Sequence, residues 1–190
     1  MSIAEVPRNA DERVFDDTLS DEPLYEVIDG LRVELLMSAL NDYLASRLTI
    51  LLGSLVLSAK LGHVVCEVMF ELPVTGRSRR RRPDVAFVSF ERWAENRRLP
   101  ERGDYWPVAP DLAIEFVSPN DEIDEMMDKL NDYFEGGVRQ VWVVHPRSRV
   151  VHVFDSAADV RGVREPAEIG GGDVLPGLRI PVAVMFPPRP

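Results

Sequence analysis

The chain has 190 residues, 45% of them hydrophobic and 28% charged, as in a soluble globular protein with a core of its own. Its 32 acidic and 22 basic side chains give a formal net charge of −10. This balance argues against tight, indiscriminate binding to nucleic acid, because that affinity comes largely from basic side chains that meet phosphates.

The first half of the chain predicts an arm, a hairpin, a long helix and a strand. Residues 1–20 are acidic and aperiodic, and we expect a mobile arm there, ahead of a single domain over residues 21–190. Strand-like runs at residues 25–29 and 31–36 meet at Asp29-Gly30, a strong turn signal. Helical spacing of apolar residues extends from about residue 38 to residue 61, with Gly62 as the stop. Residues 63–74 predict one strand, and residues 75–83 a polar connection.

The second half predicts a buried strand, a helix and a hairpin. Residues 84–90 form a strand and residues 91–110 a loop, before the nearly continuous apolar run of residues 112–117, which belongs in the middle of a sheet. Ser118 to Asp121 fits the start of a helix that ends at Gly136-Gly137. The apolar stripe of this helix is Ile123, Met126, Met127, Leu130 and Phe134. Residues 139–145 and 149–154 form a hairpin, and the tail is a loop with one short edge element. We therefore expect an α/β fold, with a central mixed β-sheet flanked by helices and an N-terminal β-hairpin.

Three ionisable side chains stand where a charge is costly. Asp84 opens the apolar run of residues 84–90, and Glu115 lies inside the run of residues 112–117. An ionised carboxylate there costs several kcal/mol unless it is paired or bound to a cation. Lys129 falls about 60° from Met126 on the predicted helix, so it can reach along the sheet to the preceding strand.

Each of these residues also has an ordinary structural interpretation. Asp84 fits a strand cap, Glu115 a partner for a buried arginine, and Lys129 a solvated helix residue. Together, however, two carboxylates from neighbouring strands and a lysine from the next helix can hold Mg²⁺ or Mn²⁺ beside a cationic donor. Such an ion activates water and neutralises charge on a phosphate.

An arginine run lies directly before Asp84, although the chain as a whole is acidic. Alone, such a run is usually a solvated loop or a general basic patch. Beside the candidate site, it predicts a contact with the phosphate backbone of a nucleic acid through Arg79, Arg80, Arg81 and Arg82.

The sequence also predicts where the protein resides. No apolar run approaches the roughly 20 residues that a membrane span needs, and the N-terminus lacks the pattern of a secretory signal. The single cysteine, Cys66, has apolar neighbours and is expected to be a buried, reduced thiol. We therefore expect a cytoplasmic protein with no membrane partner.

Several segments together match a known pattern: Pro83-Asp84, IEFVSP around Glu115, Lys129-x-x-x-Tyr133-x-x-x-Gly137-Val138, and VWVVHP. In this combination the chain resembles the Uma-two family of restriction endonucleases, a branch of the PD-(D/E)xK nuclease superfamily. YEVIDG at residues 25–30 and GGDVLPGLRIPV near the end extend the resemblance over residues 24–186.

The resemblance implies a restriction-endonuclease-like core, a metal ion held by Asp84 and Glu115, and a catalytic role for Lys129. Superfamily members usually place the lysine two residues after the glutamate, where this chain has Val117. In this family the lysine is supplied from the following helix, which is why Lys129 is the candidate. Auxiliary candidates are Glu67, Glu34 and Tyr133.

Two hypotheses of function follow. The first is a Mg²⁺- or Mn²⁺-dependent endonuclease that acts on DNA as a homodimer, because two-fold related sites cut both strands of a duplex most simply. The long first helix and the apolar hairpin of residues 139–154 suggest the surface for that dimer. The second is a non-catalytic module on the same fold that binds nucleic acid or another protein. A third, weaker hypothesis is nuclease action on RNA or on a specialised nucleic-acid structure.

Overall fold

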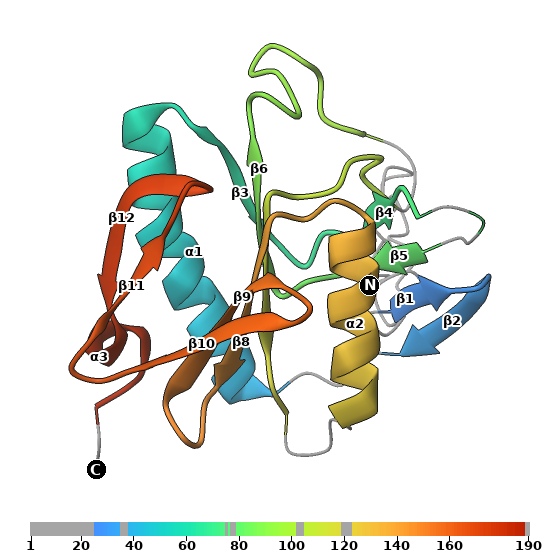
Figure 1. Cartoon of the computed structure of the whole chain (residues 1–190). Coiled ribbons are helices and arrows are strands. Elements are labelled where there is room, and N and C mark those ends of the chain that lie inside the picture. The colour runs from blue at the N-terminus through green and yellow to red at the C-terminus, as the bar shows by residue number, and fades with distance from the viewer. Residues whose placement is uncertain are drawn as a thin grey trace, which may run out of the picture.

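A six-stranded mixed sheet separates the two long helices, α1 (Ala39–Ala59) and α2 (Ile123–Glu135), which cover its opposite faces (Figure 1). The computed structural model describes residues 25–34, 38–74, 76, 79–101, 105–118 and 123–188. The sheet order is β10-β9-β8-β7-β6-β3, and only β7 and β8 are parallel within it. Its strands are β3 (Gly62–Cys66), β6 (Val85–Ser89), β7 (Leu112–Phe116), β8 (Gln140–His145), β9 (Val150–Ser156) and β10 (Asp159–Arg164).

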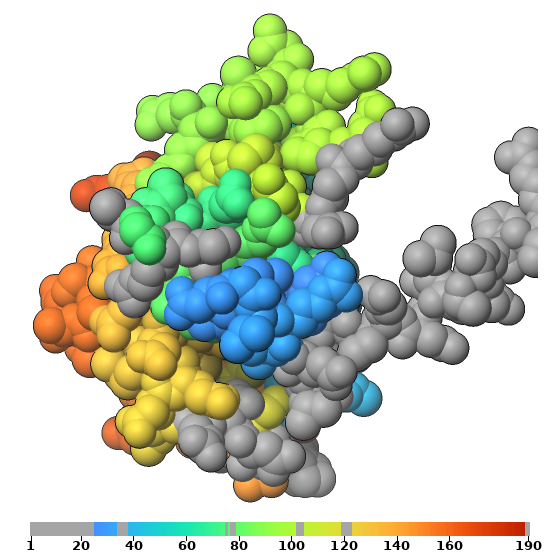
Figure 2. All heavy atoms as spheres, turned by 90° about the vertical axis from the view of Figure 1, so that its right-hand side faces the viewer, coloured from blue at the N-terminus to red at the C-terminus, as the bar shows by residue number. Residues whose placement is uncertain are grey.

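Two smaller sheets flank the central one. The N-terminal hairpin belongs to a four-stranded sheet of order β2-β1-β5-β4, beside α2 (Figure 2). Its strands are β1 (Tyr25–Ile28), β2 (Leu31–Glu34), β4 (Phe70–Leu72) and β5 (Arg79–Arg81). On the α1 side, β11 (Glu168–Gly171) pairs with β12 (Leu175–Pro181), and the short helix α3 (Val182–Met185) follows.

The core lies in two layers, one on each face of the central sheet. Because side chains alternate along a strand, Leu112, Ile114 and Phe116 of β7 join the cluster under α1. Ala113, between them, joins the cluster under α2, which includes Leu130 and the fully buried Tyr133. By the same alternation Glu115 faces α2.

Much of the predicted architecture is confirmed. The hairpin turns at Asp29 and Gly30, both with positive φ, as an Asp-Gly turn requires. Ser38 caps α1 by accepting a hydrogen bond from the backbone N–H of Asn41. The strand at residues 112–117 lies in the interior of the sheet, and the hairpin of residues 139–154 is β8 and β9. The predicted α/β fold, with a central mixed sheet flanked by helices and an N-terminal β-hairpin, is confirmed.

Two boundaries in the first half were predicted wrongly. The strand expected over residues 63–74 is two strands in different sheets, because the chain turns at Glu67, whose φ is 55°. Helix α1 ends through Lys60 in the left-handed conformation, and Gly62 belongs to β3 instead. A Cβ at Gly62 would lie 2.1 Å from the carbonyl oxygen of Val88, so this glycine permits a close strand approach.

The remaining corrections concern side chains and the tail. Ile123 and Met127 of the predicted apolar stripe are exposed, and the buried face of α2 contains Leu130 and Tyr133 instead. Cys66 is exposed rather than buried. The tail carries three further strands and α3 instead of one edge element. The arm predicted at residues 1–20 and the helix start at residues 119–121 lie outside the described residues.

Candidate functional site

The strand register brings Asp84 and Glu115 together. Strands β6 and β7 are antiparallel, with Val85 opposite Ile114. One step further along this register places Asp84 opposite Glu115, on the same face of the sheet. A hydrogen bond of 2.6 Å from the backbone N–H of Phe116 to Asp84 Oδ2 fixes the aspartate there. The two carboxylates therefore lie side by side at one edge of the sheet, although 31 positions separate them in the sequence.

Glu67 continues the same row on the next strand. Cys66 of β3 lies opposite Val85, so one further step places Glu67 opposite Asp84. The backbone N–H of Glu67 donates to the carbonyl oxygen of Asp84 at 3.3 Å, and the guanidinium of Arg82 donates to the carbonyl oxygen of Glu67. Neither side-chain oxygen of Glu67 has a hydrogen-bond partner within the described part of the chain, although both are buried. Its positive φ is a strained conformation for a residue with a side chain.

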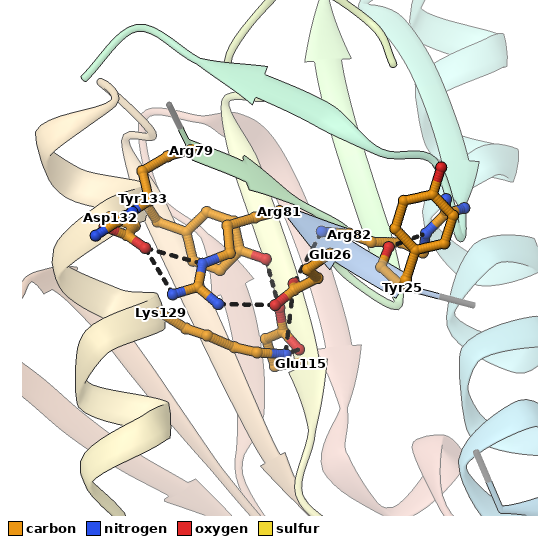
Figure 3. Close-up of polar contacts among 9 residues, drawn as sticks. All are labelled: Tyr25, Glu26, Arg79, Arg81, Arg82, Glu115, Lys129, Asp132 and Tyr133. Carbon is orange, nitrogen blue, oxygen red and sulfur yellow. Dashed lines mark hydrogen bonds and ion pairs between the residues drawn. The ribbon is translucent and has the colours of Figure 1, made fainter. Parts of the chain in front are cut away.

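Helix α2 supplies the groups that hold Glu115 (Figure 3). Lys129 Nζ donates to Glu115 Oε2 at 3.2 Å, and the Tyr133 hydroxyl donates to Glu115 Oε1. Both residues lie on the helix face toward the sheet, one turn apart, as the sequence predicted for this flank. Among the described residues, each oxygen of Glu115 thus has one hydrogen-bond partner, which leaves it a second lone pair.

Burial and mutual repulsion control the acidity of this row. Burial raises the pKa of the Asp84 carboxyl to about 8, and the charge of Glu115 adds to this effect. Burial raises the pKa of Glu67 to about 7 and also raises the pKa of Glu115. Burial opposes the charge on Lys129, but Glu115 and Glu26 raise its pKa above the ordinary value. The row therefore combines carboxyls that resist ionisation with a lysine that stays charged, and an added cation would relieve the carboxyls.

Sequence reasoning missed Glu26, a second carboxylate in contact with Lys129. It comes from β1, is 1% exposed, and lies 3.6 Å from Lys129 Nζ. It also accepts hydrogen bonds from the Arg81 guanidinium at 2.7 Å and from the backbone N–H of Arg82 at 2.9 Å. The available signal was a glutamate within the strand-like run YEVI, where a charge is as costly as at Glu115. The N-terminal hairpin thereby contacts the candidate site directly.

Asp132 is the second residue that was missed. It lies on α2 three positions after Lys129 and is 5% exposed. Its carboxylate accepts from Arg79 Nε at 2.9 Å and from Arg81 at 2.6 Å and 2.9 Å (Figure 3). A buried ion-pair network thus joins β1, β5, α2 and β7.

The arginine run is not the polar connection that the sequence predicted. Arg79–Arg81 is strand β5, between β1 and β4, and Arg79 and Arg81 are buried. Arg80 pairs with Glu71 at 3.2 Å and lies over the ring of Tyr105. Arg82 donates to the carbonyl oxygen of Tyr25 at 3.1 Å. All four guanidinium groups have partners inside the fold, and a role in nucleic-acid binding stays a prediction.

The donor set fits a divalent cation in its chemistry. Carboxylate oxygens suit Mg²⁺ and Mn²⁺, and the two oxygens of Glu67 are buried without a hydrogen-bond donor among the described residues. No three His, Cys, Asp or Glu side chains in the described ranges already stand close enough to share one ion. A cation at Asp84 and Glu115 would therefore have two carboxylates from the described residues, which hydrogen bonds from Phe116, Lys129 and Tyr133 hold in position. Glu67 lies next to Asp84 in the strand register. Glu34, the other auxiliary candidate, ends β2 opposite Tyr25.

Comparisons with known proteins agree with this fold. The family model described as "Uma2: Putative restriction endonuclease" matches residues 15–183. The crystal structure of a "putative nuclease belonging to DUF820" from Anabaena variabilis is similar with a TM-score of 0.73 at 18% identity, over 90% of this chain and 96% of that chain. No curated protein matches the chain. Since the family model covers most of its length, the chain belongs to the Uma2 family of nuclease-like proteins described as restriction endonucleases.

Proposed function

We propose that the protein is a metal-dependent endonuclease that hydrolyses phosphodiester bonds in DNA. The observation that carries this proposal is the contact of three elements at one sheet edge: Asp84 before β6, Glu115 in β7 and Lys129 on α2. The family assignment supports a nuclease, and the chemistry of the site supports a metal-dependent one.

Asp84 and Glu115 are the residues that would hold Mg²⁺ or Mn²⁺. Such an ion, when bound, lowers the pKa of water and offsets negative charge on a phosphate. The protein contributes position: the N–H of Phe116 fixes Asp84, and Tyr133 orients Glu115. Lys129 brings a positive charge that its two carboxylate partners keep protonated, and this charge stabilises the extra negative charge of the transition state.

The test combines metal binding with cleavage. Titration calorimetry with Mn²⁺ is expected to show binding to the wild type, and supercoiled plasmid is expected to be cut in Mg²⁺ or Mn²⁺ but not in EDTA. A wild-type protein without measurable metal affinity, together with unfolding of Glu115→Gln, would make Glu115 a structural ion-pair partner and the nuclease proposal wrong.

The second candidate is a non-catalytic module on the same fold. Two observations favour it: the net charge is −10, and the arginines beside the site are engaged within the fold. This reading expects no metal-dependent cleavage of DNA or RNA, with binding of a nucleic acid or a protein retained. Asp84 and Glu115 are neighbours in the strand register and Lys129 is bonded to Glu115, so the nuclease is the better supported proposal.

We also propose that the enzyme is a cytoplasmic homodimer with one domain per chain. Two related sites can cut both strands of a duplex. The β8–β9 hairpin, one of the two surfaces expected to mediate the dimer, lies inside the sheet, where Val141, Trp142 and Val144 are fully buried. The surface for a second copy must therefore come from elsewhere.

Lys129→Met is expected to lower the cleavage rate by about 10²–10³-fold, the typical cost of removing one group that stabilises transition-state charge. Mn²⁺ binding measured by calorimetry should be largely kept, because Asp84 and Glu115 remain. The matched control is Arg98→Met, which removes a positive charge from a side chain that is 84% exposed on the loop after β6. Equal rates for Lys129→Met and the wild type would remove Lys129 from the catalytic site.

A further inference from the structure

Helix α1 is apolar on both sides. Its inner face, with Leu44, Leu48 and Leu52, is buried against the central sheet. Its outer face carries large apolar side chains in solvent, and Ile50 is 71% and Leu57 76% exposed. By length and composition α1 could cross a membrane, but its inner face is part of the protein core, so it cannot leave the sheet for lipid without losing that core. The outer face is a surface that another apolar surface should cover.

The outer face has the spacing of a helix-packing seam. Going along α1, its positions fall at intervals of 3, 4, 3, 4 and 3 residues: Leu40, Tyr43, Arg47, Ile50, Ser54 and Leu57. This is the alternation of the two core positions of a heptad, which keeps one stripe directed at a partner helix. Within the stripe, Arg47 is already engaged with the carbonyl oxygen of Val184 and the hydroxyl of Tyr43. The stripe thus presents apolar side chains and one arginine, whose guanidinium is turned to neutral oxygens of its own chain.

The charges at the two ends of α1 favour a second copy of the same helix, packed antiparallel, as the partner. Asp42 lies exposed in the first turn, and Lys60 lies exposed directly after the last turn. In an antiparallel pair of two α1 helices centred near Leu51, Asp42 of each copy meets Lys60 of the other, and the helix dipoles are opposed. A parallel pair would place Asp42 beside Asp42 and Lys60 beside Lys60. The two ends of the helix are therefore complementary in charge in the antiparallel orientation, while the stripe between them carries Arg47.

A groove beside the stripe offers room for the partner's side chains. It has a volume of about 360 Å³ and lies between α1, at Leu51 and Leu55, and β12, at Leu178 and Ile180. Its lining is mostly apolar, and its polar side chains are Ser54, Ser58 and Arg179. Figure 1 shows β12 beside α1, on the side away from α2.

We propose that the outer face of α1 is the homodimer interface, with the α1 helices of two copies packed antiparallel around Ile50 and Leu51. The inference is independent of the proposed nuclease activity, because it rests on α1 and β12 alone. Its failure would leave the site of Asp84 and Glu115 untouched.

The first experiment measures mass in solution by light scattering at micromolar concentration. The wild type is expected at about twice the chain mass of 21.4 kDa, and Ile50→Lys at the chain mass itself. The matched control is Ile123→Lys, which places the same charge at another exposed isoleucine, 82% exposed on α2, and should stay dimeric. A monomeric wild type, or a dimeric Ile50→Lys, overturns the proposal. Circular dichroism on Ile50→Lys should match the wild type, since this side chain is outside the core.

The second experiment determines whether the two α1 helices pack antiparallel or parallel. It uses disulfide trapping in a Cys66→Ser background. Ile50→Cys, near the two-fold axis, should form a cross-linked dimer under mild oxidation, because a disulfide needs Cα atoms about 4.4–6.8 Å apart. Leu57→Cys should not, since an antiparallel partner presents the start of its helix there. Cross-linking at both positions would indicate a parallel pair and contradict the proposal. Flotation of a monomeric wild type with lipid vesicles would assign the face to a membrane surface instead, and would equally overturn it.

Discussion

Asp84→Asn and Glu115→Gln should each abolish Mg²⁺- and Mn²⁺-dependent cleavage of plasmid DNA, and the double variant should be no worse than either single one. If both carboxylates hold one cation, removing the first already removes what the second contributes, so the two effects do not add. In Asp84→Asn the amide oxygen can still accept the hydrogen bond from the N–H of Phe116, so the site keeps its shape. Single-turnover rates on one substrate test this. Additive losses would mean that the two carboxylates act separately.

Without metal, Asp84→Asn should stabilise the folded protein, although it should abolish cleavage. The pKa of Asp84 in the folded protein, about 8, lies above the ordinary value of 3.8. A carboxyl with a raised folded pKa favours the folded state fully below pH 4, and this stabilisation is lost as pH rises through 8. Without metal, therefore, the wild type should lose stability between pH 5 and pH 8, and Asp84→Asn should be more stable at pH 8 by about 2–4 kcal/mol.

Urea unfolding in EDTA at pH 5 and pH 8 measures this difference, and Asp111→Asn is the control. Asp111 is another buried aspartate, at the opposite edge of the same sheet, but it is paired with Arg92 at 2.9 Å and accepts from the N–H of Ser89. Its loss should therefore destabilise the protein. If Asp84→Asn also destabilises at pH 8, the Asp84 carboxylate is paired by something other than a cation, and the metal site is wrong.

The predictable and unpredictable parts of this site differ in a physical way. Asp84 and Glu115 could be proposed because each breaks a local apolar pattern, and a charge in such a pattern is costly whatever the fold. Lys129 was proposed from its position on the predicted helix and from the family resemblance. The residues that surround them depend on register across strands far apart in the chain. Glu26 reaches Lys129 only because β1 pairs with β5, and Glu67 joins the row only because the chain turns at that residue. Local spacing carries no information about such pairings.

The arginine run also shows that local sequence does not reveal distant partners. A solvated basic loop and a strand of buried ion pairs have the same local sequence, because the arginines are distinguished only by distant partners. Alternation in β5 directs Arg79 and Arg81 to Asp132 and turns Arg80 the other way, toward Glu71. Asp132 is 50 or more positions away, on another element. Composition therefore predicted a polar loop, whereas residues 79–81 form a strand whose buried charges attach the hairpin and α2 to each other.

Replacing Arg81 with methionine should lower the free energy of unfolding far more than the same replacement of Arg80. Arg81 lies between Glu26 at 2.7 Å and Asp132 at 2.6 Å, and all three side chains are buried. Arg81→Met leaves both carboxylates without this partner and should lower the free energy of unfolding by about 3–5 kcal/mol. Arg80→Met removes a half-exposed pair with Glu71 and should cost less than about 1 kcal/mol.

Urea unfolding of the two variants, with and without Glu26→Gln and Asp132→Asn in the Arg81→Met background, decides the matter. The added changes should recover much of the loss, because they remove the buried charges that Arg81 no longer balances. Suppose instead that Arg81→Met is as stable as Arg80→Met and lowers affinity for duplex DNA, with a salt dependence flattened by about 0.9 in log K per log of salt concentration. Arg81 would then contact phosphate as the sequence first suggested, and the buried network would not be what holds the hairpin against the site.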